Sequence, residues 1–126
     1  MARSILDEAH IHPAIRERIA GYRADVVKEV QAVVAANPVV VVGTRMNPFP
    51  KKARRLLDAA GIAYHYLEFG SYLDEWRRRL ALKMWTGWPT FPMVFVKGVL
   101  IGGASDLEKL IASGSLVSDL DQPKAQ

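Results

Sequence analysis

The fold of this chain is decided by one stretch near its C-terminal end, Gly-Trp-Pro-Thr-Phe-Pro-Met-Val-Phe-Val-Lys-Gly-Val-Leu-Ile-Gly-Gly, residues 87–103. The stretch begins with an irregular segment that contains two prolines. The apolar run from Met93 to Val96 then predicts a strand, and Val99 to Ile101 predicts a second one. Because Lys97-Gly98 has the length and composition of a tight turn, the stretch predicts a β-hairpin.

A helix is expected directly after the hairpin. Ser105 is followed three residues later by Glu108, which is the spacing of a capping box, so we expect Ser105 to cap the N-terminus of this last helix. Gly114 is expected to end it. The polar tail from Val117 to Gln126 predicts a frayed end.

Strands and helices alternate upstream of the hairpin. Val39 to Val42 is a continuous β-branched run, typical of a buried central strand, and Ile62 to Phe69 alternates as a second strand. Between them, Asn47 followed by Pro48 predicts an N-cap and the first position of a helix, which Gly61 is expected to end.

Two more helical segments complete the order. Apolar residues recur every three or four positions from Pro13 to Ala36, which predicts one helix, or two if Gly21 interrupts it. Residues 1–12 predict a loose arm, and Tyr72 to Trp85 predict a further helix. Three apolar side chains of that helix are expected to be available for burial: Trp76, Leu80 and Trp85. The predicted fold is an α/β three-layer sandwich with a four-stranded mixed sheet and an extra N-terminal helix.

Composition narrows the functional classes. The chain has 126 residues, enough for one domain, and no apolar run is long enough to span a bilayer. The N-terminal residues lack the apolar core of a signal peptide, so we expect a cytoplasmic location and no membrane association. The formal net charge of +4 permits an acidic protein partner without indicating nucleic acid. His10 and His12 are weak candidates for a metal site, and we expect none.

The chain contains no cysteine. This absence excludes disulfide bonds, a cysteine nucleophile and thiolate ligation of zinc or an iron–sulfur cluster by the chain itself.

Three motifs resemble the glutaredoxin family, which has the thioredoxin fold. Residues 87–98, with Trp-Pro-Thr-Phe-Pro, resemble the stretch around the family's cis-proline, and are nearer to its monothiol branch. Residues 100–107 resemble the family's double-glycine turn into the last helix. Residues 47–53 stand where the family carries its Cys-Pro-Tyr-Cys or Cys-Gly-Phe-Ser active site. The resemblance runs from about Val30 to Leu116 and implies a thioredoxin-like sandwich.

The resemblance also implies a division of the chain. Residues 1–25 are expected to form an N-terminal arm and helical extension. Residues 26–117 are expected to form the glutaredoxin-like domain, and residues 118–126 a polar tail.

The departures from the family pattern fall on its reactive positions. Asn47 occupies the position of the nucleophilic cysteine, and Pro50 that of the resolving cysteine. Val42 stands where the family has a lysine that contacts glutathione, and Ala104-Ser105 where it has Cys-Asp. The family's thiol–disulfide oxidoreductase activity and its glutathione-ligated cluster are therefore excluded, because both need the missing thiolate.

A binding groove can persist without the thiol. Helix N-termini favour anions, and the resemblance implies a groove beside the cis-proline and an arginine, matched here by Arg79, that contacts the glycyl carboxylate of glutathione. The candidate glutathione-binding residues are Arg45, Asn47, Arg79, Phe91, Pro92, Gly103, Ala104 and Ser105. Asn47 and Ser105 also have a purely structural interpretation, as helix caps.

Three functions remain open. The leading hypothesis is a non-catalytic module that holds glutathione, or a peptide or protein partner, at the former active-site groove. The first alternative is a glutathione-dependent enzyme that uses the thiol of the ligand, with Thr44 or Asn47 stabilising its thiolate. The second is an interaction scaffold that uses its N-terminal helix and basic faces, as a homodimer or with an acidic protein. The sequence leaves the oligomeric state open.

Overall fold

The fold is built around one mixed sheet. A computed structural model describes residues 3–45, 47–69 and 75–120. In this part of the chain four strands pair in the order β2-β1-β3-β4. The central strand β1 (Val39–Thr44) is parallel to β2 (His65–Phe69) and antiparallel to β3 (Met93–Val96), which forms the hairpin with β4 (Val99–Gly102). The predicted four-stranded mixed sheet is confirmed.

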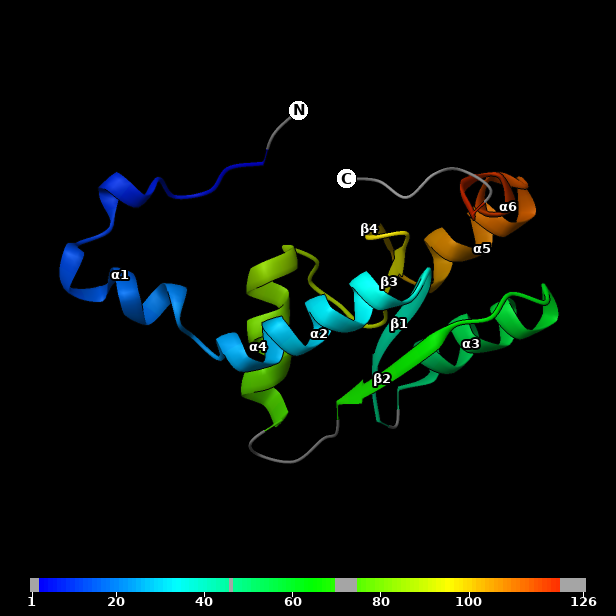
Figure 1. Cartoon of the computed structure of the whole chain (residues 1–126), viewed down its shortest axis with the longest axis horizontal. Helices are drawn as coiled ribbons and strands as arrows, with labels where there is room; N and C mark the ends of the chain where they lie inside the picture. Colours follow the sequence, from blue (N-terminus) through cyan, green and yellow to red (C-terminus); the bar gives the residue numbers. More distant parts are fainter. Residues whose placement is uncertain (1–2, 46, 70–74, 121–126) are drawn as a thin grey trace.

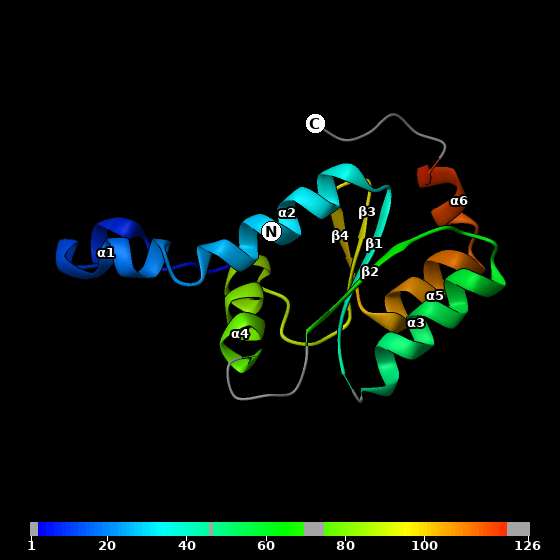
Figure 2. The same cartoon turned by 60° about the horizontal axis from the view of Figure 1, so that its bottom comes forward.

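Helices cover both faces of the sheet, which gives three layers (Figures 1 and 2). One face carries α2 (Ala24–Ala36) and α4 (Glu75–Thr86). The opposite face carries α3 (Pro48–Ala59), α5 (Ala104–Ala112) and α6 (Ser115–Leu120). The predicted α/β three-layer sandwich is therefore confirmed.

The N-terminal segment lies to one side of this sandwich. The short 3-10 helix η1 (Glu8–His10) and α1 (Pro13–Ala20) stand away from the sheet (Figures 1 and 2). Neither helix contains a buried residue. Residues 21–23 separate α1 from α2, so of the two alternatives left open by the sequence the structure has two helices, interrupted at Gly21.

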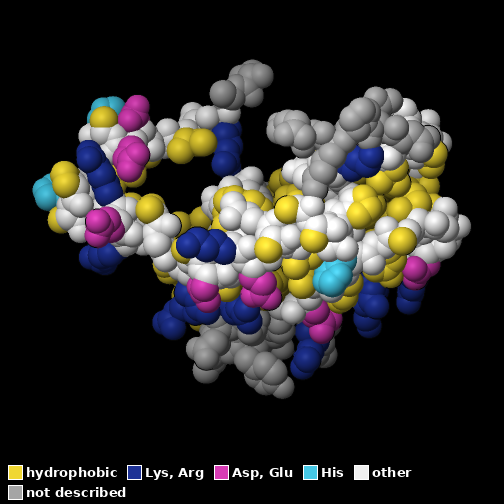
Figure 3. Space-filling view, viewed as in Figure 1, with side chains coloured by type: hydrophobic (Ala, Val, Ile, Leu, Met, Phe, Trp, Pro, Cys, Tyr) yellow, Lys and Arg dark blue, Asp and Glu magenta, His cyan; other side chains and the backbone are white. Residues whose placement is uncertain are grey.

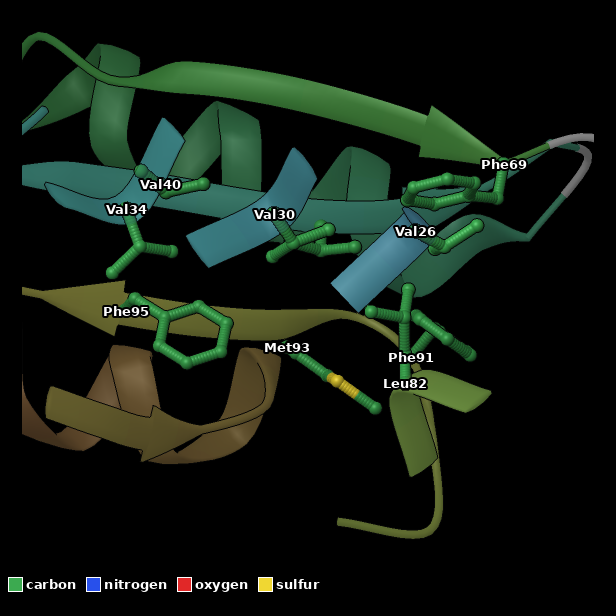
Figure 4. Close-up of a cluster of buried hydrophobic side chains, with 10 residues drawn as sticks. Val26, Val30, Val34, Val40, Phe69, Leu82, Phe91, Met93 and Phe95 are labelled. Atoms are coloured by element: carbon green, nitrogen blue, oxygen red, sulfur yellow. The ribbon is translucent and has the colours of Figure 1, made fainter. Parts of the chain in front are cut away.

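The valine run of β1 supplies both halves of the core. Side chains alternate across a strand, so Val40 and Val42 face α2 and α4, whereas Val39 and Val41 face α3 and α5. Figure 4 shows the first cluster, in which Val40 lies near Val34 of α2, whereas Phe69 of β2 lies near Val26 at the other end of the same helix. A continuous apolar strand is typical of a sheet covered on both faces.

Strand β2 is shorter than predicted, because the residues before it cap α3. Gly61 has a φ of +71° and its amide donates to the carbonyl of Asp58. The amide of Ile62 donates to the carbonyl of Leu57 at 3.0 Å. These two bonds form a Schellman motif, so Ile62 belongs to the helix end and the strand begins at His65.

The predicted cap of the last helix is wrong. The N-cap of α5 is Gly103, and Ser105 lies inside the first turn. The carboxylate of Asp106 accepts a hydrogen bond of 3.0 Å from the Gly103 amide, so Asp106 takes the role expected of Glu108. Gly102 has a φ of +115°, and an added Cβ there would collide with the Asp106 carboxylate. The absence of a side chain at Gly102 therefore gives this carboxylate room to fold back.

Two further expectations are corrected at the surface. Trp76 and Leu80 remain 45% and 38% exposed, whereas Trp85 is half-buried and stacks on Phe95 with ring centroids 5.9 Å apart. The tail is helical to Leu120, since α6 places Leu116 in the core. Residues 121–126 and Tyr72, where the α4 helix was predicted to begin, lie outside the described residues.

Substitution of Gly43, in β1, is expected to disturb the fold. An added Cβ would lie 2.7 Å from Cβ of Pro50 and 2.9 Å from the Tyr66 hydroxyl, and Pro50 is held in the first turn of α3. We expect Gly43→Ala to lower the free energy of unfolding by about 1–3 kcal/mol, measured by urea denaturation. The matched control is Gly103→Ala, where the nearest atom to an added Cβ is 3.5 Å away. A smaller loss for Gly43→Ala than for the control would contradict this packing.

Candidate functional site

A pocket opens where the end of β1, the first turns of α3 and α5, and one side of α4 meet. Its volume is about 600 Å³. The irregular loop before β3 forms its remaining wall. The lining residues are Thr44, Asn47, Phe49, Arg79, Lys83, Trp88, Pro89, Thr90, Phe91, Pro92, Gly103, Ala104, Ser105 and Asp106.

The structure brings most of the candidate residues together in this pocket. Seven of the eight line it: Asn47, Arg79, Phe91, Pro92, Gly103, Ala104 and Ser105. Arg45 does not line the pocket. It is exposed, and its Nε lies 3.8 Å from a carboxylate oxygen of Glu68 on β2. The peptide bond between Phe91 and Pro92 is cis.

Asn47 holds three elements together. Its Oδ1 accepts a hydrogen bond of 3.0 Å from the Phe49 amide, which confirms Asn47 as the N-cap of α3. Its Nδ2 lies 3.4 Å from both the Thr44 hydroxyl and the carbonyl oxygen of Phe91. Both distances are at the long end for hydrogen bonds, so each bond is weak. The amide thus ties the helix to β1 and to the loop before β3.

Cations dominate the charged groups of the pocket. Arg79 and Lys83 lie one helical turn apart on α4 and both line the pocket. Lys83 Nζ lies 5.8 Å from the ring centroid of Phe91. The acidic side chain in the lining, Asp106, already accepts a hydrogen bond from Gly103. The site is therefore suited to an anion.

Lys83 and Trp88 were not among the predicted site residues. Lys83 stands four residues after Arg79, and this helical spacing was the signal that could have found it. Trp88 lies on the wall of the pocket with its ring against Gly103. Its indole Nε1 is buried and has no hydrogen-bond partner among the described residues.

The first turn of α3 is supported from behind by a polar cluster on β2. The Tyr66 hydroxyl donates to a Glu68 carboxylate oxygen at 3.1 Å, and the Arg54 guanidinium lies 4.3 Å from the centroid of the Tyr66 ring. Burial, together with the hydrogen bond to Glu68, raises the pKa of Tyr66 from 10.0 to about 12. Tyr66 also fills the space beside Gly43, on which Pro50 packs.

Neither a membrane-spanning helix nor a cluster of metal ligands is found among the described residues. None of their helices has the length and apolar character that a membrane crossing requires. Within the same residues, no three histidine or acidic side chains are grouped as metal ligands would be.

Comparisons with known proteins point to one family. A sequence profile described as Glutaredoxin matches residues 38–101. A glutaredoxin-like protein of Dictyostelium discoideum is 46% identical over 102 residues, which cover 81% of this chain and 83% of that protein. Glutaredoxin-C4, chloroplastic, of Oryza sativa subsp. japonica is 37% identical over 93 residues, which cover 74% and 70%.

Solved structures agree with the sequence comparisons. The crystal structure of a buckwheat glutaredoxin–glutathione complex superposes with a TM-score of 0.70 and 28% identity, covering 83% of this chain and 92% of that one. Wheat glutaredoxin superposes with a TM-score of 0.69 and 32% identity, covering 78% and 91%.

The raised pKa of Tyr66 predicts a loss of stability at alkaline pH. The unfolded state releases the phenolic proton near pH 10, whereas the folded state keeps it until about pH 12. The stabilisation is thus complete below pH 10 and is lost as the pH rises toward 12. We expect the free energy of unfolding to fall more steeply across this interval in the wild type than in Tyr66→Phe, as measured by urea denaturation at a series of pH values. Equal slopes would contradict the assignment.

Proposed function

The chain belongs to the glutaredoxin family, and we propose that it is a member that binds glutathione reversibly in the pocket between α3, α4 and α5, without thiol–disulfide chemistry. One observation carries the proposal. The groove residues expected from the family surround a pocket with two cations, while an amide side chain stands at the position of the nucleophile.

The charged ends of glutathione have matching groups in the pocket. Arg79 and Lys83 are placed to attract one carboxylate. The first turn of α5 offers a second anion site, because the leading amides of a helix lack partners within it. The Gly103 amide is already bonded to Asp106, so the amides of Ala104 and Ser105 are the ones available to the second carboxylate.

The backbone of the ligand is expected to pair beside Pro92. The Phe91 carbonyl accepts a hydrogen bond from Asn47 Nδ2 at 3.4 Å. A carbonyl oxygen has two lone pairs, so Phe91 can accept another hydrogen bond from an extended ligand. The ring of Trp88 adds an apolar surface on the same wall. The relative of known structure that is a glutathione complex supports this choice of ligand.

Because the chain has no thiol, bound glutathione cannot form a covalent bond with it. The chain has 0 cysteines, so neither a mixed disulfide with glutathione nor a protein thiolate ligand for a cluster can form. Binding then rests on ionic contacts and hydrogen bonds alone. A dissociation constant near 1 mM corresponds to only about −4 kcal/mol, and we expect affinity in this range.

The test is an NMR titration of the nitrogen-15-labelled protein with reduced glutathione. We expect amide shifts gathered at Phe91, Gly103 and Ser105. Lys83→Gln is expected to raise the dissociation constant about fivefold, because it removes one ion pair of about 1 kcal/mol. Lys51→Gln is the matched control, since Lys51 is exposed on α3 and does not line the pocket. Its dissociation constant should equal that of the wild type.

S-methylglutathione separates binding from an activity of the ligand's thiol. It has the same carboxylates and backbone but no thiol, so we expect it to bind within about twofold of glutathione. A large loss of affinity, together with glutathione-dependent turnover, would favour an enzyme that stabilises the glutathione thiolate. Absence of shifts at the pocket with either compound would refute the proposal.

A further inference from the structure

An aromatic side chain stands uncovered at the edge of the pocket. Phe49, in the first turn of α3, lines the pocket and is 56% exposed. Among the described residues, no other large hydrophobic side chain of comparable exposure lines it. Pro89, on the loop before β3, is an exposed apolar residue of the same lining. Small-molecule sites are lined mostly by apolar and aromatic side chains that the ligand covers, so this edge of the pocket has room for an apolar group.

The first turn of α3 offers few hydrogen-bond donors to a ligand. Pro48 and Pro50 occupy its first and third positions and have no amide hydrogen. The amide of Phe49, between them, donates to Oδ1 of Asn47 at 3.0 Å. Nδ2 of Asn47 is directed to β1 and to the loop before β3. The start of a helix ordinarily attracts an anion through its free amides, and here those amides are missing or already bonded. This wall therefore suits an apolar group better than a thiolate.

The sulfur of glutathione faces this wall in the binding mode proposed above. The two carboxylates are then held at α4 and at the first turn of α5, and the backbone pairs beside Pro92. The wall that these contacts leave uncovered is the first turn of α3, which carries Asn47 and Phe49. The cysteinyl residue is the central one of the tripeptide, so its side chain is directed there. A group bonded to the sulfur then extends over Phe49.

Charge distinguishes this ligand from a simple apolar compound. Arg79 and Lys83 line the pocket, and Lys and Arg side chains gather over α4 and α3 in the space-filling view (Figure 3). Such a surface attracts an anionic ligand. A glutathione that carries an apolar group on its sulfur keeps both carboxylates, so it matches the cations and the uncovered aromatic ring together.

We propose that the pocket takes S-conjugates of glutathione, thioethers in which an apolar group is bonded to the sulfur, and that this group packs on Phe49. The proposal rests on the proposed binding of glutathione in this pocket. A thioether sulfur has no proton to lose and needs no donor to stabilise a negative charge, which fits a wall that has few donors. The chain holds the conjugate and releases it unchanged, because it has no thiol.

The test compares three ligands by NMR titration of the nitrogen-15-labelled full chain: glutathione, S-methylglutathione and S-hexylglutathione. We expect the hexyl compound to bind about tenfold more tightly than the methyl compound, because the longer chain and the Phe49 ring remove apolar surface from water. The additional amide shifts of the hexyl compound are expected at Phe49 and its neighbours in α3.

Phe49→Ala tests the contact itself. The readout is the ratio of the dissociation constants of the methyl and hexyl compounds, and we expect it to fall from about ten to about two. Phe49→Leu retains an apolar side chain and is expected to keep most of the ratio. Val117→Ala is the matched control, since Val117 is 57% exposed on α6 and does not line the pocket, and its ratio should equal that of the wild type. Circular dichroism checks that the variants remain folded.

Three results would overturn the proposal while leaving glutathione binding intact. The methyl and hexyl compounds could bind equally well at the pocket. The ratio could stay unchanged in Phe49→Ala. The additional shifts of the hexyl compound could gather at the groove that Ala81 and Met84 line, rather than at Phe49. Absence of shifts at the pocket with all three ligands would refute glutathione binding and the present proposal together.

Discussion

The site depends on how the first turn of α3 is held against the end of β1. Gly43 has no side chain, so Pro50 can pack directly on the backbone of β1, where a Cβ on residue 43 would collide with it. The Tyr66 hydroxyl of β2 packs on the same position. Asn47 then joins the helix to Thr44 and to the Phe91 carbonyl. Because these contacts fix α3 relative to the loop before β3, they also set the shape of the pocket between them.

Asn47, which the resemblance places at the position of the family's nucleophilic cysteine, has a structural role in this chain. Asparagine is among the best N-cap residues, and its amide both accepts from Phe49 and donates across the groove. The position thus retains the task of beginning the helix, while the chemistry of a thiolate is absent. Arg79, Lys83 and the first turn of α5 keep the pocket suited to an anion.

The sequence predicted most helices and strands correctly, because their positions follow from apolar periodicity, turn residues and helix caps within a few residues of each other. The valine run of β1, the Lys97-Gly98 turn and the Asn47-Pro48 start of α3 all lie where the sequence placed them. The predictions that were wrong concern features that depend on tertiary contacts. Asp106 and Glu108 are both near enough to cap α5, and only the backbone of Gly102 and Gly103 selects Asp106. Three other features depend on contacts between residues that are distant in the sequence. They are the burial of Leu116, the pairing of Arg45 with Glu68 and the position of Lys83 in the pocket.

If glutathione binds in the groove as proposed, its sulfur atom lies near position 47, so a thiol introduced there is expected to react with it. The most direct measurement is the rate at which Asn47→Cys forms a mixed disulfide with oxidised glutathione, followed by intact mass. Ala112→Cys is the control, since Ala112 is exposed in the last turn of α5, where a helix disfavours a thiolate. We expect Asn47→Cys to react about tenfold faster or more at neutral pH, and we expect the additional substitution Lys83→Gln to slow the reaction. Equal rates for the two cysteine variants would contradict binding of glutathione in the groove.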